Sequence, residues 1–178
     1  MVNEEEIYKT YHGDEERGFK LLLSAYQEPI YYFIRRMVVD HDDAEDVMQE
    51  TFIRVYRNLG RFRRESSLSS WIYKIASNEC MRFLNHRKKE LTATELLDDA
   101  LISTLKASEY VDYDQQMAVH FQEALLRLPD KQRLVFNLRY YDELEYDEIS
   151  KITGMKAATL KVDFHYAKEK IKNYMTKE

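Results

Sequence analysis

The sequence predicts an all-α protein of two small helical domains joined by an acidic linker, with a helix-turn-helix unit in the C-terminal domain. Two of the supporting observations are compositional. Only four glycines and two prolines occur among 178 residues, and Leu, Glu, Lys and Arg are abundant. The third is that apolar residues recur at intervals of three and four along most of the chain, which is the spacing of a buried helix face.

The same composition excludes several classes of protein and site. The single cysteine, Cys80, rules out an intramolecular disulfide, and no Cys or His spacing suggests a metal site. The N-terminal sequence MVNEEEIYKT lacks the basic and apolar segments of a secretion signal, and no apolar run is long enough to cross a bilayer. We therefore expect a cytoplasmic protein without a metal, a cofactor or direct insertion into the membrane.

The N-terminal domain is placed at residues 1–89, and its first two predicted helices follow directly from periodicity. Residues 19–38 carry an apolar stripe, with Pro29 tolerable only near a helix start or at a kink. Residues 40–60 begin with acidic side chains, where the helix dipole favours negative charge. Gly60 suits the position just after the end of this second helix.

A short basic loop leads into a third predicted helix. Ser66 or Ser67 is expected to cap its N-terminus, because a hydroxyl there can accept from the free N–H groups of the first turn. Further along this helix, Trp71 is expected to be partly buried and Cys80 to be a small buried residue.

The linker is placed at residues 90–118, where the helical regularity is lost. This stretch is acidic, with Thr, Ser and Asp scattered through it, so it predicts at most transient helix. The helical pattern returns at Val119, pauses at Pro129, and continues through the second domain at residues 119–178.

Within the second domain, a short helix, a tight turn and a longer helix follow one another. The short helix covers residues 145–153, the turn contains Gly154, and the longer helix covers residues 156–175. This order is typical of a helix-turn-helix unit, whose second helix fits the DNA major groove and presents its N-terminal side chains to base edges. A plain helical hairpin is the alternative.

Charge is distributed in blocks along the chain. Residues 54–89 hold ten Lys or Arg and two acidic residues, a net charge of +8, although the whole chain carries −5. Residues 151–178 form a second basic block, with seven Lys and three acidic residues. Residues 1–53 and 90–118 are acidic. Two basic blocks on helical motifs favour contact with a polyanion at two places, and solvated basic faces are the alternative.

The first basic block differs from the second because aromatic and polar side chains lie among its cations. Stacking surfaces beside positive charge are what unpaired bases require. The loop at residues 61–70 could hold a flipped base, and Asn78 could contact a base edge.

Three segments, taken in order, resemble the sigma-70 family of bacterial transcription initiation factors, and its extracytoplasmic-function class in particular. Residues 43–59, DAEDVMQETFIRVYRNL, resemble region 2.2, and residues 62–89, FRRESSLSSWIYKIASNECMRFLNHRKK, resemble regions 2.3 and 2.4. Residues 128–171 resemble region 4, and region 2.1 lies near residues 19–38. The resemblance implies a non-enzymatic factor that binds core RNA polymerase and directs it to promoters.

The resemblance also implies partners and site residues. The partners are the polymerase β′ coiled coil and β flap, promoter DNA and an anti-sigma factor. For docking on polymerase, the matching positions are Asp43, Asp46, Gln49, Glu50 and Arg54. For recognition and melting of the minus-ten element, they are Arg61, Arg63, Arg64, Ser66, Ser67, Trp71, Lys74, Asn78, Arg82, Arg87 and Lys88. For the minus-thirty-five element, they are Lys156, Ala158, Thr159, Lys161, Val162, Asp163, His165, Tyr166 and Lys170.

The recognition helix departs from the family pattern at two positions. Asp163 and Tyr166 stand where the family often has arginine. An aspartate repels phosphate but can accept from the amino group of cytosine, so the minus-thirty-five sequence cannot be inherited from relatives.

Two other classes of function are weighed against this one. A stand-alone helix-turn-helix regulator of duplex DNA would not need residues 43–89. An enzyme would need a catalytic motif, and neither a nucleophile–base pattern, HExxH, a P-loop nor a Gly-rich loop occurs in the sequence.

Overall fold

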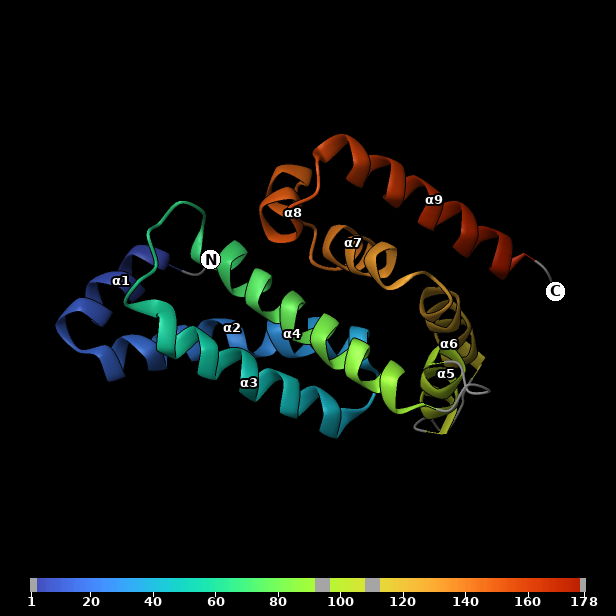
Figure 1. Cartoon of the computed structure of the whole chain (residues 1–178), viewed down its shortest axis with the longest axis horizontal. Helices are drawn as coiled ribbons and strands as arrows, with labels where there is room; N and C mark the ends of the chain where they lie inside the picture. Colours follow the sequence, from blue (N-terminus) through green and yellow to red (C-terminus); the bar gives the residue numbers. More distant parts are fainter. Residues whose placement is uncertain (1–2, 92–96, 108–112, 177–178) are drawn as a thin grey trace.

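The computed structural model describes residues 3–91, 97–107 and 113–176, and the regular structure in them is entirely helical (Figure 1). The helices are α1 (Glu4–Gly13), α2 (Glu15–Val38), α3 (His41–Leu59), α4 (Leu68–Glu90), α5 (Leu97–Ala107), α6 (Tyr113–Leu126), α7 (Asp130–Tyr140), α8 (Tyr146–Thr153) and α9 (Ala157–Met175). The expected all-α class is thus confirmed. No helix in the described ranges is long and apolar enough to span a membrane.

Side-chain caps explain where the first four helices begin. Asn3 Oδ1 accepts from the Glu6 N–H at 3.2 Å, and Asp14 Oδ1 accepts from the Arg17 N–H at 3.0 Å. Asp40 caps α3, and Ser67 caps α4 through a 3.0 Å bond from the Ser70 N–H. These side chains satisfy N–H groups that have no partner within the helix. Of the two serines expected to cap α4, Ser67 is therefore the one that does so.

Three details of the N-terminal helices differ from the expectations. A first helix, α1, precedes the predicted ones, and α2 begins at Glu15 rather than near Phe19. Pro29 lies inside α2, with its ring on the exposed side of the helix. Gly60 has φ −64°, so the chain leaves α3 without using the left-handed conformation that glycine permits.

The expectation of at most transient helix between residues 90 and 118 is wrong for α5. Its apolar side chains recur at every third or fourth residue and are buried: Leu97, Leu101, Ile102 and Leu105. α6 also begins at Tyr113, before the predicted start at Val119. Apolar spacing outweighs acidic composition here, because the buried face of α5 joins the main core.

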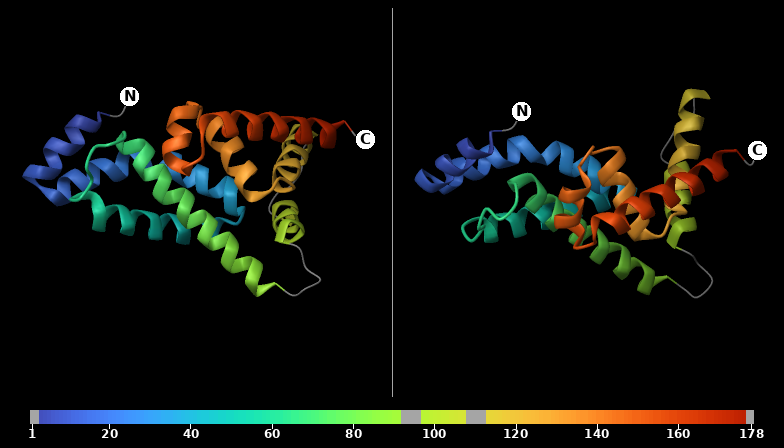
Figure 2. Two further views of the ribbon diagram at one scale, coloured as in Figure 1. Left: turned by 45° about the horizontal axis from the view of Figure 1, so that its top comes forward. Right: turned by 90° about the horizontal axis from the view of Figure 1, so that it is seen from above.

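The two predicted domains share one hydrophobic core. Figures 1 and 2 show α7 and α8 lying against α2 and α4, with α9 on the outer side of α7. Leu134, Val135 and Leu138 of α7 and Ile149 of α8 belong to the same buried cluster as Ile72 of α4. A second, smaller cluster joins α6, α7 and the C-terminal half of α9.

Polar contacts also cross between the two domains. Both Asp142 carboxylate oxygens accept from Arg36 Nη2 at 2.9 Å, and the Tyr73 hydroxyl donates to Oδ1 of the same carboxylate at 3.1 Å. Lys88 Nζ lies 2.5 Å from an oxygen of Asp130. In the described structure the N-terminal and C-terminal halves therefore form a closed arrangement.

Candidate nucleic-acid interface

An open groove of about 640 Å³ lies between the end of α3, the loop 61–67 and the first half of α4. It has the size of a small-ligand or nucleotide pocket. Six basic side chains line it: Arg54, Arg61, Arg63, Lys74, Arg82 and Lys151. Only Glu65 and Glu79 are acidic among the lining residues, so the groove favours an anionic ligand.

Glu79 organises two of these cations. Its side chain is 6% exposed, and its two oxygens lie 2.7 Å from Arg54 Nε and 2.8 Å from Arg82 Nη1. A buried carboxylate between two guanidinium groups fixes both of them in place. The sequence placed Arg54 on the polymerase-docking face, whereas its side chain lines the groove.

Aromatic rings form one wall of the groove. The Trp71 and Phe62 ring centroids lie 4.8 Å apart, and Trp71 is partly buried, as expected. The Phe62 ring in turn stacks on Tyr8 of α1, with centroids 5.8 Å apart and an interplanar angle of 2°. Sequence reasoning missed Phe62, although its place inside the basic run RFRR is a signal for a stacking residue.

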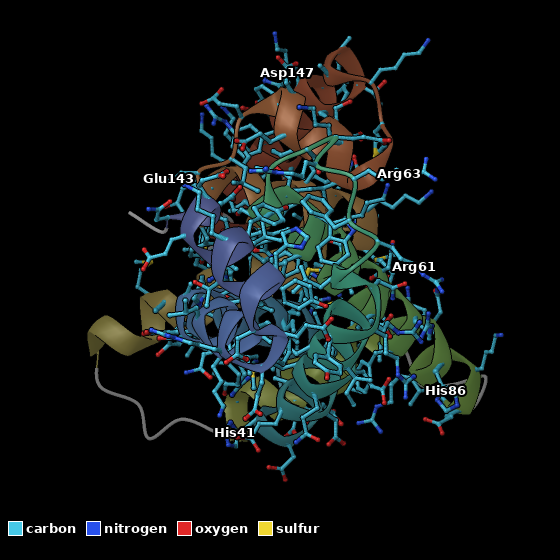
Figure 3. The ribbon with its side chains drawn as sticks, turned by 90° about the vertical axis from the view of Figure 1, so that its left-hand side faces the viewer. His41, Arg61, Arg63, His86, Glu143 and Asp147 are labelled. Atoms are coloured by element: carbon cyan, nitrogen blue, oxygen red, sulfur yellow. The ribbon has the colours of Figure 1, made fainter. Side chains whose placement is uncertain are left out.

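The residues predicted for the minus-ten element fall into two sets. Seven line the groove: Arg61, Arg63, Ser66, Trp71, Lys74, Asn78 and Arg82. In Figure 3, Arg61 and Arg63 point outwards from one side of the molecule, on which His86 of α4 also lies. Two of the groove-lining cations, Arg61 and Arg63, are thus exposed on this side of the molecule.

The other four predicted residues are engaged elsewhere. Arg64 pairs with Glu5, and Ser67 caps α4. Arg87 Nη2 lies 3.3 Å from Asp43, while Lys88 pairs with Asp130 across the two halves. None of these four side chains lines the groove in the closed arrangement.

The outer face of α9 carries the residues predicted for the minus-thirty-five element. Leu160, Ala167 and Ile171 are buried on its inner side. The exposed residues are Lys156, Ala158, Thr159, Lys161, Val162, His165, Tyr166 and Lys170. Val162 is 52% exposed and Tyr166 is 56% exposed, so two large apolar side chains face solvent among lysines. Asp163 is half-buried.

The acidic residues of α3 lie on a third surface. Asp46, Gln49 and Glu50 are exposed, opposite the buried Phe52 and Val55. Asp43 is half-buried beside Arg87, and burial raises the pKa of Asp43 despite the nearby guanidinium. Ile53, which sequence reasoning missed, is 41% exposed three residues after Glu50 and adds an apolar side chain to this polar face.

No cluster of three or more His, Cys, Asp or Glu side chains in the described residues is suited to a metal ion. The described part of the chain thus presents a basic groove with an aromatic wall, a lysine-bearing helix face with exposed Val162 and Tyr166, and an exposed acidic helix face.

Two family profiles match the chain, one in each half. Sigma-70 region 2 matches residues 22–90, and Sigma-70 region 4 matches residues 119–171. The ECF RNA polymerase sigma factor SigW of Bacillus subtilis is 30% identical over 98% of this chain and 97% of its own length. The RNA polymerase sigma-H factor of Pseudomonas aeruginosa is 29% identical over 93% of this chain and 89% of its own length.

Solved structures share the fold. The sigma factor RpoE from Bartonella quintana, in complex with the anti-sigma factor NepR, gives a TM-score of 0.69 at 21% identity, covering 90% of this chain and 98% of that one. CnrH, in complex with the cytosolic domain of CnrY, gives a TM-score of 0.69 at 15% identity, covering 96% and 95%. Both likenesses support the all-α, two-part architecture.

Proposed function

Because the chain belongs to the sigma-70 family of RNA polymerase sigma factors, in its extracytoplasmic-function class, we propose that its three surfaces divide the work of promoter-specific initiation. The chain binds core RNA polymerase and promoter DNA and acts in transcription initiation. Proteins of this family are non-catalytic factors, and we propose that this chain likewise has no catalytic site. Its work with polymerase would place it in the cytoplasm.

The groove beside α4 is our proposed site for the minus-ten element. An unpaired strand needs cations for its phosphates and flat rings for its bases, and Trp71 and Phe62 supply rings beside Lys74 and Arg63. Capture of an extruded base offsets the free energy lost when that base leaves the duplex stack. Asn78 lines the same groove and has both a donor and an acceptor for a base edge.

The outer face of α9 is our proposed reader of the minus-thirty-five duplex. Its lysines suit phosphates, which set the position of the helix on DNA, while side chains near its N-terminus reach base edges. Val162 and Tyr166 present apolar surface that suits the methyl group of thymine, and Asp163 can accept from the amino group of cytosine.

The exposed face of α3 is our proposed docking site for the polymerase β′ coiled coil. Asp46, Gln49 and Glu50 share this face with the exposed Ile53. An exposed apolar side chain beside polar ones is suited to a protein interface.

Simultaneous recognition of both promoter elements requires the closed arrangement to open. The names of the elements place them about 25 base pairs apart, which is about 85 Å of duplex. A compact chain of 178 residues has a radius of gyration of only about 16 Å. Moreover, Lys151 of α8 lines the groove, so the helix-turn-helix unit packs beside α4. We therefore propose that α7–α9 separate from α2 and α4 when polymerase binds.

The observation that carries this function is the basic, aromatic-walled groove at residues 54–82, because a simple duplex-binding regulator needs only α8 and α9. The test is to mix the purified chain with core RNA polymerase of its own host and map transcript starts from that host's genomic fragments. Discrete starts are expected with the wild-type chain. Gln49→Ala should weaken binding to core, and Asn78→Ala should leave core binding intact but abolish the starts.

Two matched variants serve as controls. Asn85 is exposed on α4 outside the groove, and Gln27 is exposed on α2. Asn85→Ala and Gln27→Ala should therefore both behave as wild type. Wild-type chain that binds no core but shifts duplex DNA alone would overturn the proposal in favour of a stand-alone regulator.

We also propose that an anti-sigma factor holds this chain inactive. The support is the class to which it belongs and a solved structure of similar fold, the sigma factor RpoE of Bartonella quintana, which is in complex with the anti-sigma factor NepR. A tagged chain purified from unstressed host cells should carry a bound protein that prevents the chain from binding core polymerase in vitro. Removal of that protein should restore binding to core polymerase. Core binding unaffected by the bound protein would exclude this role.

A further inference from the structure

The loop 61–67, which forms one side of the groove, has a backbone conformation that needs support. Arg64 has φ 59°, in the left-handed region that side chains with a Cβ rarely adopt. Such a residue persists only where the surrounding structure holds it in place, and it often marks a functional site. The residues that hold it lie on α1, before the part of the chain matched by Sigma-70 region 2.

Two side chains of α1 contact the Arg64 guanidinium. Its guanidinium forms an ion pair with the Glu5 carboxylate, and its Cζ lies 4.3 Å from the centroid of the Tyr8 ring. The hydrogen bond from Arg64 lowers the pKa of Glu5. The Tyr8 ring also stacks on Phe62, so α1 contacts the loop at both residues. Cation–π and stacking contacts of this kind fix ring and guanidinium orientations.

A third side chain of α1 fixes the start of α4. The Glu4 carboxylate accepts from the Leu68 N–H at 3.0 Å and from the Ser69 N–H at 3.1 Å. It also accepts from the Tyr26 hydroxyl of α2 at 3.1 Å. A carboxylate at this position complements the positive end of the helix dipole. Glu4 thereby holds the helix that carries Trp71 against the body of the N-terminal half.

The position of α1 is itself fixed by close packing on α2. Ile7 and Tyr11 are buried, and Gly18 of α2 lies against the Tyr11 backbone. A Cβ added at Gly18 would be 2.3 Å from Tyr11 Cα, so this approach requires glycine. The chain of contacts therefore runs from α2 through α1 to Phe62 and then to Trp71 in the groove.

From these contacts we infer that α1 positions the minus-ten loop: Glu4, Glu5 and Tyr8 are positioning residues that hold Phe62 and Trp71 ready to receive an unpaired base. This inference rests on the proposed function of the groove. The positioning residues act through the loop and do not line the groove themselves. Loss of their contacts should impair base capture and melting while leaving docking on polymerase intact.

The test uses Glu5→Gln and Tyr8→Leu, each with a matched control. Glu6→Gln makes the same charge change on an exposed neighbour, and Tyr8→Phe keeps the ring that stacks on Phe62 and lies beside the Arg64 guanidinium. The first readout is the fluorescence of Trp71, the single tryptophan of the chain, which a bound single-stranded oligonucleotide should quench. The oligonucleotide carries the minus-ten sequence that is mapped beforehand with the wild-type holoenzyme. The second is permanganate reactivity of that promoter in the holoenzyme, with core affinity measured alongside.

Glu5→Gln and Tyr8→Leu should each lower the affinity for the oligonucleotide by about threefold to tenfold and reduce promoter melting. The affinity for core polymerase should stay unchanged. Both controls should match wild type. In an Arg64→Gly background, where the left-handed conformation costs little, Glu5→Gln should have no further effect. A contribution of Glu5 to stability alone would leave oligonucleotide affinity and promoter melting unchanged.

The possible results separate this inference from the function on which it rests. If wild-type holoenzyme gives no specific melting, the proposed function of the groove is wrong. Two other results would show that α1 does not position the loop. In the first, wild type melts the promoter and the two α1 variants match their controls in both readouts. In the second, Glu5→Gln has the same effect whether residue 64 is Arg or Gly.

Discussion

The Arg36 guanidinium and the Asp142 carboxylate, 106 residues apart in the chain, form an ion pair that joins α2 to the turn after α7. The Asp142 side chain is 8% exposed and that of Arg36 is 18% exposed. The guanidinium also lies over the Tyr141 ring, 4.6 Å from its centroid. The pair is therefore a largely buried electrostatic link between the N-terminal and C-terminal halves of the protein.

Removal of Arg36 should cost more stability than neutralisation of Asp142. Burial raises the pKa of Asp142, although Arg36 and the Tyr73 hydroxyl favour its charged form. Arg36→Ala leaves this buried carboxylate without its cation and should lower the free energy of unfolding by about 3 kcal/mol. Asp142→Asn removes the buried charge and keeps an acceptor for Tyr73, so we expect a loss of about 1 kcal/mol. Urea unfolding measures both, and equal losses would contradict this account.

Cys80 should report the opening of the two halves. Its side chain is fully buried in the core shared by both halves, as expected from the sequence, and burial raises the pKa of its thiol. Modification by a thiol reagent should be slow in the free chain and about tenfold faster in Arg36→Ala or with bound core polymerase. Mass spectrometry of the chain measures the rate. A Cys80→Ala chain carrying Ser24→Cys, on exposed α2, should react rapidly in every state.

Two glycines at the α1–α2 junction should respond oppositely to alanine. Gly18→Ala forces its Cβ into the Tyr11 backbone and should destabilise the protein by about 1–3 kcal/mol. Gly13 ends α1, and a Cβ added there would meet nothing within 4 Å. Gly13→Ala should therefore be neutral or stabilising by about 0.5 kcal/mol. Thermal unfolding of both variants checks the difference, and a stable Gly18→Ala chain would contradict the close packing.

Glu123 should make the protein sensitive to acid. Burial acts to raise the pKa of Glu123, but hydrogen bonds from Lys106 and Tyr174 and the charge of Lys106 lower it below the ordinary 4.5. A carboxylate with a lowered folded pKa contributes stability that is present above its unfolded pKa and is lost as pH falls through its folded pKa. Between about pH 6 and about pH 3.5, wild type should therefore lose more stability than Glu123→Gln. Exposed Glu169→Gln, on α9, should retain the wild-type loss.

Two substitutions, one at the residue before α9 and one within α9, should separate affinity from sequence preference. Lys156→Gln should weaken all duplexes alike and reduce the slope of log K against log salt by about 0.9, as expected for one lost phosphate contact. Asp163→Asn removes a charge that repels phosphate, so binding should strengthen overall and the preferred minus-thirty-five sequence should change. Selection of bound duplexes with each holoenzyme measures both effects. An unchanged preference in Asp163→Asn would show that Asp163 does not contact a base.

The parts of the fold that the sequence predicted are those governed by local rules. Apolar spacing located the cores of α2, α3 and α4, and Gly154, with φ 74°, ends α8 as the helix-turn-helix pattern requires. The missed helix α1 also had a local signal, because Asn3 precedes a run of glutamates, and Asp14 likewise marks the earlier start of α2. α5 was missed because its acidic composition was given more weight than its apolar spacing.

The parts that could not be predicted depend on long-range contacts. Nothing in the separate segments indicates that Glu5 meets Arg64, 59 residues later, or that Lys88 meets Asp130. Such pairs depend on how helices pack and not on spacing within one helix. The same holds for Arg54, which belongs to the polymerase-docking segment by sequence but turns towards the groove to pair with Glu79.

The core shared by the two halves has a consequence for competition in the cell. If only the open form engages polymerase, the apparent dissociation constant equals the intrinsic one divided by the open fraction, so a chain that is open about 1% of the time binds about a hundredfold more weakly. The packing of α7 and α8 against α2 and α4 then sets how much of this chain must accumulate before it captures polymerase from rival factors. Substitutions far from any DNA or polymerase contact could retune that threshold.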